Sequence, residues 1–443
     1  MIFKRKIYDE LLLWKRTDDG RTAVLIQGAR RVGKSTIAEE FAANEYETYI
    51  LVDFAACSTE IRELFNDLSN LNRIFMRLQL EYGVELKERK SVIIFDEVQL
   101  APKARQAIKY LVKDGRYDYI ETGSLISIRK NVKDILIPSE EVKLHMYPMD
   151  YEEFKWALGD TATIKLLQSC FQNRTSLGDA TNRKLMRDFR LYMLVGGMPQ
   201  AVASFLESNN LEKVDSVKRS IITLYEDDFN KIDLTGNASK MFRQIPAQLT
   251  SNASRYQAWS ATDGKRNSEL AEIISEIKES MVVNMSYHAN DPSVGMALHQ
   301  DPDKYKMFAG DTGLFVTLAF WDKKFTDNTI YHKLLSDKLS ADLGYVYENA
   351  IAQMLKASGH ELYYYTFPTE SGKHNYEVDF LIADGDKISP IEVKSSGYKA
   401  HTSLDAFCTK FSARIKNKYL IYTKDMRKEE DVQYLPAYMT MFL

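Results

Sequence analysis

The stretch from Val24 to Ile37 limits the folds open to this chain more than any other. It reads VLIQGARRVGKSTI, an apolar run followed by the spacing G-x-x-x-x-G-K-S. We expect a buried strand at the apolar run, a tight loop from Gly28 to Gly33, and a helix that begins at Lys34. Glycines allow backbone turns that a Cβ would hinder, so the loop amides and the helix N-terminus can converge on an anion. The sequence therefore predicts a phosphate-binding loop.

The residues of this loop have expected tasks in binding a nucleoside triphosphate. Lys34 would reach the β- and γ-phosphates, and the Ser35 hydroxyl would hold Mg²⁺. The alternative is a glycine-containing turn that matches the spacing by chance, but the strand before it and the helix after it both favour the phosphate loop. The predicted nucleotide-binding residues are Gly28, Ala29, Arg30, Arg31, Val32, Gly33, Lys34, Ser35 and Thr36.

A second apolar run, Ser91 to Phe95, ends in Asp96 and Glu97. In a parallel sheet the carboxyl ends of the strands line the ligand crevice. We therefore expect this strand to lie next to the one that carries the loop. Asp96 would orient the Mg²⁺ shell, and Glu97 would act as the catalytic base on the attacking water, with Lys34 as the second catalytic residue. A solvated strand end is the alternative, and it does not explain the apolar run.

Strands and helices alternate over the first 150 residues or so. Further strands are expected at 49–54, 117–124 and 142–146, with helices between them. This alternation predicts a P-loop α/β domain at 1–150 with a parallel, doubly wound sheet. Thr122 and Ser124 stand at the polar end of the expected strand at 117–124 and are candidate sensors of the γ-phosphate or the attacking water. A hydroxyl that caps the next turn is an equally good interpretation.

Composition restricts the class of protein. The 443 residues allow about three domains, and 45% hydrophobic with 27% charged residues is ordinary for a soluble globular protein. The net charge of −3 gives no overall basic footprint, so any contact with nucleic acid must be local. The three cysteines lie far apart, which excludes a disulfide framework and a zinc site of the usual spacing and predicts a cytoplasmic protein. No apolar run is long enough to span a membrane.

The middle of the chain is expected to be mostly helical. Residues 151–235 are helical and aromatic, interrupted by Gly196-Gly197-Met198-Pro199, and predict a helical lid. Residues 236–335 predict a winged-helix-like domain. Its candidate recognition helix, 267–280, would repel a phosphate backbone, which favours a structural or partner-binding role. That helix carries Glu269, Glu272, Glu276 and Glu279 against Lys278.

The last predicted domain, 336–443, is a further α/β unit. Strand periodicity puts Glu377 and Asp379 on one face, and Glu392 and Lys394 on one face of the next strand. A preceding helix, 344–355, brings Glu348.

Such a group of carboxylates with a lysine is what metal-assisted phosphodiester cleavage requires. Asp379 and Glu392 would hold Mg²⁺, Glu348 would be a further ligand, and Lys394 would orient the water. The alternative is a strand pair closed by an ion pair between Glu392 and Lys394. Downstream cations would contact a nucleic-acid backbone or form a solvated face: Lys399, Lys410, Arg414, Lys416 and Lys418.

Several segments together resemble the prokaryotic AAA-family ATPases that carry a C-terminal domain of unknown function with a PD-(D/E)xK nuclease-like fold. The segments are GARRVGKST (28–36), IIFDEVQ (93–99), ETGS (121–124), PMDYEEF (148–154), LVGGMPQAV (194–202), AGDTGL (309–314), YENAIAQML (347–355), and EVDFLI with IEVKSS (377–396). The resemblance implies ATP rather than GTP, hydrolysis by the AAA domain, a winged-helix-like middle, and a C-terminal α/β domain of restriction-endonuclease type.

Two positions depart from the family's pattern. Ser139-Glu140 stands where the family shows Gly-Arg, so Arg116, Arg129 or Arg190 would have to replace an arginine that contacts nucleotide. Val378 replaces the proline of the nuclease-like motif, a mild change because the metal ligand is Asp379.

Three functions remain open at this point. The leading hypothesis is an ATPase with bound ATP and Mg²⁺, whose nucleotide state controls the C-terminal domains. The alternatives are an ATP-regulated, Mg²⁺-dependent DNA nuclease and a non-catalytic module that binds DNA or a protein partner. Assembly into an oligomer is compatible with each of them.

Overall fold

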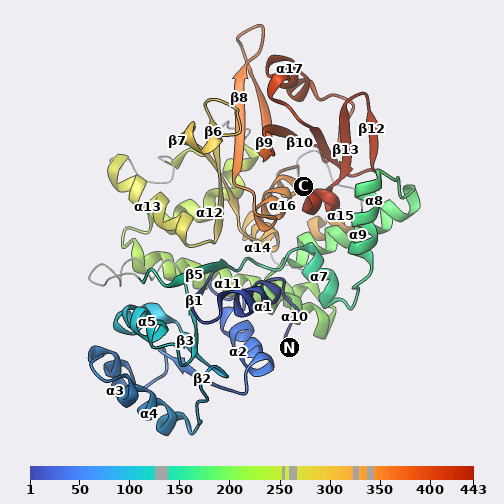
Figure 1. Cartoon of the computed structure of the whole chain (residues 1–443). Coiled ribbons are helices and arrows are strands. Elements are labelled where there is room, and N and C mark those ends of the chain that lie inside the picture. The colour runs from blue at the N-terminus through green and yellow to red at the C-terminus, as the bar shows by residue number, and fades with distance from the viewer. Residues whose placement is uncertain (125–137, 252–254, 259–266, 323–328, 337–343) are drawn as a thin grey trace. The chain divides into compact units, whose positions relative to one another are not determined.

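The computed structural model of the 443-residue chain describes all residues except 125–137, 252–254, 259–266, 323–328 and 337–343 (Figure 1). Internal contacts divide it into two compact units. The first comprises residues 1–147 with 279–281, and the second comprises 148–278 with 282–443. No helix among the described residues is both long enough and apolar enough to cross a lipid bilayer.

The first unit is built on a five-stranded parallel sheet with the order β2-β3-β4-β1-β5. The apolar run before the phosphate loop forms β1, which is buried throughout. The strand that ends in Asp96, β3, was expected to lie next to the loop strand β1. This prediction was wrong, because β4 lies between them. The strands are β1 (Ala23–Gln27), β2 (Thr48–Asp53), β3 (Ser91–Asp96), β4 (Asp118–Gly123) and β5 (Glu141–His145).

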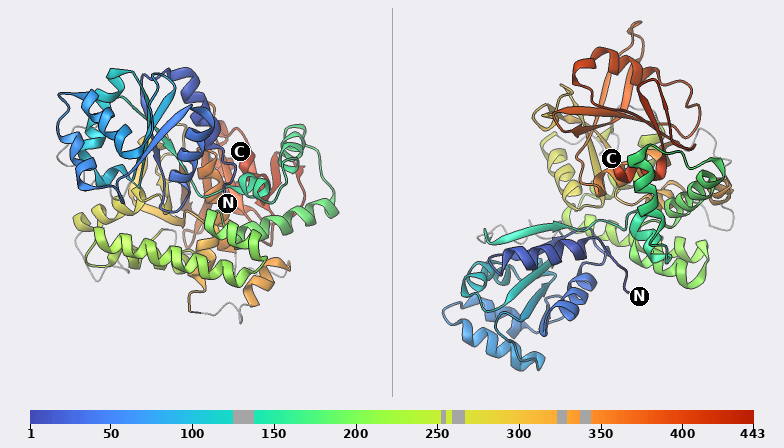
Figure 2. Two further views of the ribbon diagram at one scale, coloured as in Figure 1. Left: turned by 90° about the horizontal axis from the view of Figure 1, so that it is seen from below. Right: turned by 45° about the vertical axis from the view of Figure 1, so that its right-hand side comes forward.

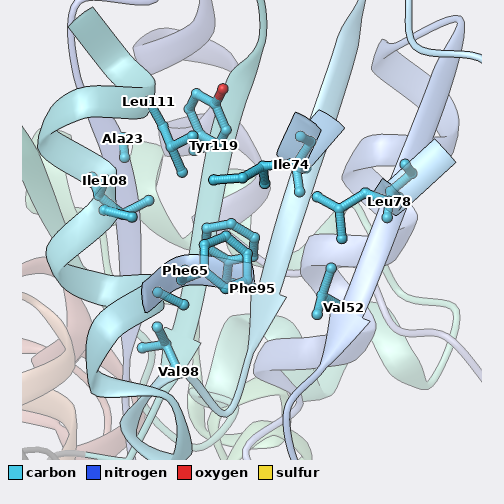
Figure 3. Packing of buried hydrophobic residues seen from close by; sticks show 14 of the residues in the cluster. Ala23, Val52, Phe65, Ile74, Leu78, Phe95, Val98, Ile108, Leu111 and Tyr119 are labelled. Carbon is cyan, nitrogen blue, oxygen red and sulfur yellow. The ribbon is translucent and has the colours of Figure 1, made fainter. Parts of the chain in front are cut away.

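Helices cover both faces of this sheet. The helices are α1 (Ile7–Asp18), α2 (Lys34–Glu45), α3 (Thr59–Glu63), α4 (Leu71–Tyr82) and α5 (Pro102–Asp114). Helix α2 packs against β2, β3 and β4, whereas α4 and α5 close the other face over a large apolar core. In that core Phe65 and Phe95 pack edge to face with ring centroids 5.3 Å apart, beside Leu78 and Ile108 (Figure 3). This α/β/α arrangement confirms the parallel sheet that the alternating pattern predicted.

The first half of the second unit is helical, as expected for 151–235. Its helices are α7 (Tyr151–Ala157), α8 (Thr163–Asn173), α9 (Asp179–Val195), α10 (Pro199–Ser208), α11 (Leu211–Ile232), α12 (Asn237–Thr250) and α13 (Asn267–Glu279). Asp150 begins α7 with a capping box, since its side chain accepts from the Glu153 amide while the Glu153 side chain accepts from the Asp150 amide.

The second half of this unit holds an eight-stranded mixed sheet in the order β12-β13-β11-β10-β9-β8-β6-β7, with its later strands in orange and red in Figure 2. The strands are β6 (Val283–Ala289), β7 (Gln300–Ala309), β8 (Leu362–Pro368), β9 (Asn375–Asp384), β10 (Lys387–Val393), β11 (Lys418–Tyr422), β12 (Arg427–Glu429) and β13 (Val432–Pro436). Helices α14 (Thr312–Ala319), α15 (Thr329–Leu335), α16 (Gly344–Ala357) and α17 (Thr402–Lys410) accompany them.

One sheet thus runs across the expected boundary at 335/336. Strands β6 and β7, which follow α13, form an antiparallel hairpin. However, β6 also pairs in parallel with β8, so the hairpin continues the C-terminal sheet. The four-domain division and the winged-helix-like domain stay predictions.

Three of the quoted motifs meet at one point of the second unit. The Asp311 carboxylate accepts a hydrogen bond from the Gly197 amide at 2.5 Å, and the Met149 amide donates to the Gly197 carbonyl at 2.7 Å. A Cβ on Gly197 would lie 2.0 Å from the Met149 carbonyl oxygen, and one on Gly313 would lie 2.6 Å from the Gly196 Cα. PMDYEEF, LVGGMPQ and AGDTGL are therefore parts of one close-packed backbone junction.

Candidate functional site

The phosphate loop has the backbone geometry that the glycine spacing predicted. Gly33, immediately before α2, adopts a φ of 99°, which favours glycine. A Cβ on Gly28 would lie 2.3 Å from the Met146 carbonyl oxygen, so this position admits no side chain. Arg31 also has a positive φ, 69°. The loop therefore turns tightly enough to place successive amides, and the N-terminus of α2, around one anion.

Lys34 is the first residue of α2, and its side chain is buried. Its Nζ donates to the carbonyl oxygens of Gly28 and Ala29 at 3.1 and 3.0 Å. Burial lowers the pKa of the Lys34 ammonium, against the opposing effect of the Glu97 and Asp96 carboxylates. An ammonium has three N–H donors, so Lys34 can hold the loop and still donate to a phosphate.

Ser35, Asp96 and Thr122 meet at the carboxyl edge of the sheet. The Ser35 hydroxyl donates to Asp96 Oδ1 at 2.6 Å, and the Thr122 hydroxyl donates to the same oxygen. Asp96 ends β3 and Thr122 lies on β4, the strand between β3 and the loop strand. The structure thus brings Ser35 and Asp96, the predicted magnesium ligands, together although β4 lies between β3 and the loop strand β1. Strand β4 contributes Thr122.

Glu97 follows Asp96 in a left-handed conformation with a φ of 52°, uncommon for a non-glycine residue. Its amide donates to the Thr122 hydroxyl oxygen at 3.3 Å, and its Oε2 accepts from the Gln99 side-chain amide. The backbone turn and the two hydrogen bonds fix where its half-buried carboxylate lies. Gln99 was not singled out in the sequence, although it ends the quoted segment IIFDEVQ.

The other predicted loop residues occupy the expected stretch. Ala29 and Val32 are buried, Arg30 is half-buried, and Thr36 is exposed on the first turn of α2. Ser124 follows β4 directly and is half-buried. Its predicted contact with nucleotide, and that of Thr122, stay predictions.

The structure does not identify which of Arg116, Arg129 and Arg190 would replace the nucleotide-contacting arginine of the family. Arg116 precedes β4, at the amino edge of the sheet and away from the loop, and pairs with Asp114 at 2.6 Å. It is therefore badly placed to contact phosphates held by its own loop. Arg190 belongs to the second unit, where its Nε donates to the Tyr347 hydroxyl at 3.4 Å. Arg129 lies outside the described residues.

The residues of this edge fit ATP with Mg²⁺. The Ser35 hydroxyl and the Asp96 carboxylate are hard oxygen ligands of the kind Mg²⁺ prefers, and they already share one hydrogen bond. The loop amides and Lys34 match a polyphosphate, whereas Glu97 is an acceptor that can take a proton from water.

The carboxylates predicted for the nuclease-like site lie on neighbouring elements. Asp379 on β9 accepts a hydrogen bond from the Val393 amide at 2.7 Å, which ties it to β10. Glu392 on β10 pairs with Lys394 at 2.8 Å, and its other oxygen accepts from the Leu404 amide at 3.2 Å. The ion pair between Glu392 and Lys394, held open as an alternative, is therefore present. Glu348 on α16 is the remaining member.

Burial dominates the electrostatics of this cluster. It raises the pKa of Asp379 well above the usual carboxyl range, and the negative charge of Glu348 adds to the shift. Burial also raises the pKa of Glu348. Burial lowers the pKa of Lys394, but Glu392, Asp379 and Glu348 together outweigh it, so the pKa is raised.

Lys306 on β7 is a member that sequence reasoning missed. Its ammonium donates to Glu377, 71 positions further along the chain. A pattern of residues within one strand or helix cannot predict a pair so far apart. The pKa of Lys306 is raised, because Glu377, Glu348 and Asp379 together outweigh the lowering effect of burial. Among the described residues no group of three or more Asp, Glu, His or Cys side chains is placed to hold a metal ion. The predicted magnesium site of this cluster gains no support, and DNA cleavage stays a prediction.

Three family descriptions match parts of the chain. Residues 20–155 match an AAA domain, residues 186–324 match a domain of unknown function (DUF8612), and residues 343–439 match a domain of unknown function (DUF4143). No curated protein matches the chain.

Similar solved structures are distant. The Walker-type ATPase PABY2304 of Pyrococcus abyssi is 15% identical, with 72% of this chain and 96% of that chain covered and a TM-score of 0.41. The Thermotoga maritima RuvB Holliday junction branch migration motor is 12% identical, with coverages of 63% and 89% and a TM-score of 0.28. Cdc6p from Pyrobaculum aerophilum is 12% identical, with coverages of 76% and 94% and a TM-score of 0.24.

The match to residues 20–155 spans the loop, the Asp96 strand and Thr122. The chain therefore carries an AAA domain at residues 20–155, most of which lies in its first unit.

Proposed function

We propose that this protein binds and hydrolyses ATP at the carboxyl edge of the first sheet, and that the nucleotide state controls its second unit. One observation carries the first part: Lys34, Ser35, Asp96 and Glu97 converge on one edge, where the Thr122 hydroxyl donates to the Asp96 carboxylate and accepts from the Glu97 backbone amide. A structural turn would not require a buried lysine, a carboxylate that accepts two hydroxyl donors, and a strained glutamate in the same place.

The tasks of the individual residues follow from these contacts. The loop amides and Lys34 hold the β- and γ-phosphates and offset their charge. Ser35 and Asp96 would hold Mg²⁺, which when bound would neutralise negative charge that develops on the phosphates. Glu97 accepts a proton from the attacking water, and Gln99 with the left-handed turn keeps its carboxylate in place.

Two substitutions test the ATPase assignment. Lys34→Ala should abolish ATP binding or turnover, because the only side-chain cation assigned to the phosphates is removed. Glu97→Gln should keep ATP binding and lower turnover by about 10²-fold or more, because the amide cannot accept the proton. Steady-state phosphate release and equilibrium binding of a fluorescent ATP analogue measure both. Lys113→Ala, an exposed lysine of α5, is the control. Wild-type turnover in Lys34→Ala would refute the assignment.

Control of the second unit requires that it interact differently with the ATP and ADP states. The AAA family match covers residues 20–155 and says nothing of a partner. DNA and a protein are the two candidate partners of the second unit.

A further inference from the structure

A cavity of about 660 Å³ lies in the second unit, between the start of α9 and the connection from β11 to β12. Its size falls within the range of small-molecule sites. All of its lining residues belong to residues 176–190 and 398–427, so it is separate from the phosphate loop and from the carboxylates around Asp379.

The two walls of this cavity are held together by Asp425. Its carboxylate accepts hydrogen bonds from the Ser176 hydroxyl at 2.5 Å, the Gly178 amide at 2.6 Å and the Leu177 amide at 3.2 Å, all from the segment before α9. Asn182 on α9 donates to the Thr423 carbonyl at 3.2 Å. The cavity is therefore preformed, and the charge of Asp425 is already matched by donors.

Cations outnumber acids in the lining. Arg183, on the second turn of α9, and Lys424, in the opposite wall, are both exposed. Neither has an acidic partner within the part of the chain that the structure describes. Arg427, which pairs with Glu429 at 2.9 Å, and the buried Arg190 also line the cavity, whereas Asp179 is the one acid of the lining besides Asp425. Two exposed cations in the lining of one cavity, neither paired with an acid, attract an anion.

The remaining wall is aromatic. Tyr398 and Tyr422 line the cavity, with their ring centroids 5.3 Å apart in an edge-to-face arrangement. The Arg427 guanidinium lies 5.6 and 5.9 Å from these two rings and 4.4 Å from that of Tyr434. Aromatic rings and stacked guanidinium groups beside phosphate-binding cations are the surroundings that protein sites offer to a nucleobase.

We infer that this cavity binds a nucleotide, with its phosphate between Arg183 and Lys424 and its base against the wall of Tyr398 and Arg427. The ligand carries a phosphate next to a planar ring, and such a group comes either from a free mononucleotide or from the phosphorylated end of a single strand. The inference does not rest on ATP hydrolysis in the first unit.

The test uses the full chain in a Lys34→Ala background, so that the phosphate loop contributes little to binding. AMP, inorganic phosphate and a short single-stranded DNA with and without a 5′-phosphate are titrated by calorimetry. Arg183→Ala with Lys424→Ala should lower the affinity for AMP or the 5′-phosphorylated strand by about tenfold or more, since each cation forms a charge-assisted bond. The matched control is Lys184→Ala with Lys428→Ala, exposed lysines on α9 and β12 that do not line the cavity.

The outcomes separate the parts of the inference. Tighter binding of AMP than of the strand supports a free nucleotide, and the reverse order supports a strand end. Tyr398→Leu should weaken AMP and leave phosphate unchanged, whereas Tyr398→Phe should bind as the parent does. Inorganic phosphate bound as tightly as AMP would overturn the base contact. Absence of binding by every probe at millimolar concentration, or equal affinity in the double variant and its control, would overturn the site.

Discussion

At the scale of single residues, Thr122 links the two acids of the ATP site. Its hydroxyl donates to Asp96 and accepts from the Glu97 amide, so one buried side chain sets the position of the magnesium holder and of the base. The residues of the phosphate loop, and the pair Asp96 and Glu97, were predictable because each group is contiguous in the sequence. The link through Thr122 was not, because it joins residues 25 and 26 positions apart on different strands.

Thr122→Val should lower ATP turnover by about tenfold, because it keeps the shape of the side chain and removes its hydrogen bonds to the Asp96 carboxylate and the Glu97 amide. The KM for ATP should change much less, since the loop and Lys34 are intact. Thr122→Ser, which retains the hydroxyl, should recover most of the turnover. Steady-state kinetics of the three proteins measure this; a loss of ATP binding equal to the loss of turnover would show that Thr122 only supports the fold.

A second residue-scale feature is the buried group of Glu121, Glu141 and Arg105. Arg105 pairs with Glu141 at 3.2 Å, with side chains 2% and 1% exposed. Neither Glu121 oxygen has a donor among the described residues, and its polar neighbour is the Glu141 carboxyl. Burial raises the pKa of Glu121 well above its ordinary value of 4.5, and the charge of Glu141 adds to this. Burial therefore favours the protonated form of the Glu121 carboxyl.

This raised pKa makes stability fall as the pH rises. Above pH 4.5 the unfolded Glu121 loses its proton while the folded one keeps it, so the free energy of unfolding decreases until the pH passes the folded pKa. Glu121→Gln, a neutral mimic of the protonated acid, should raise the thermal midpoint at pH 7.5, and the gain should vanish towards pH 4.5. Calorimetric scans between these values measure it; an equal gain at every pH would contradict a raised pKa of Glu121 in the folded protein.

At the scale of elements, the pattern of apolar and polar residues predicted strands and helices well and their order in the sheet poorly. The insertion of β4 between β1 and β3, and the pairing of β6 with β8, depend on contacts between distant segments. Local periodicity carries no information about such pairings. The same holds for Lys306, which joins the C-terminal carboxylates from β7.

The backbone junction around Gly197 permits a test at this scale. Gly197→Ala should destabilise the second unit by about 1–3 kcal/mol, because the new Cβ would meet the Met149 backbone and force the two segments apart. Gly344→Ala is the control, since its Cβ would meet nothing closer than the Ser395 hydroxyl at 3.5 Å. Chemical denaturation followed by circular dichroism compares them; equal stability of the two variants would mean that the junction can relax.

At the scale of the whole molecule, the proposed control by nucleotide should appear as a difference in the dynamics of the second unit. Hydrogen exchange in residues 148–278 and 282–443 should differ between Glu97→Gln with ATP and the wild type with ADP, because control requires a contact that one state lacks. Lys34→Ala should show no nucleotide-dependent change. Identical exchange in both nucleotide states would leave hydrolysis uncoupled from this unit.

The sheet shared by β6, β7 and the C-terminal strands has a practical consequence for dissecting the protein. Strand β8 lies between β6 and β9, so a fragment cut at residue 336 would expose the hydrogen-bonding edge of β8. Bare edges of this kind recruit other chains and promote aggregation. A fragment that contains the region around Asp379 should therefore begin before residue 283, so that it includes the β6–β7 hairpin that covers the edge of β8.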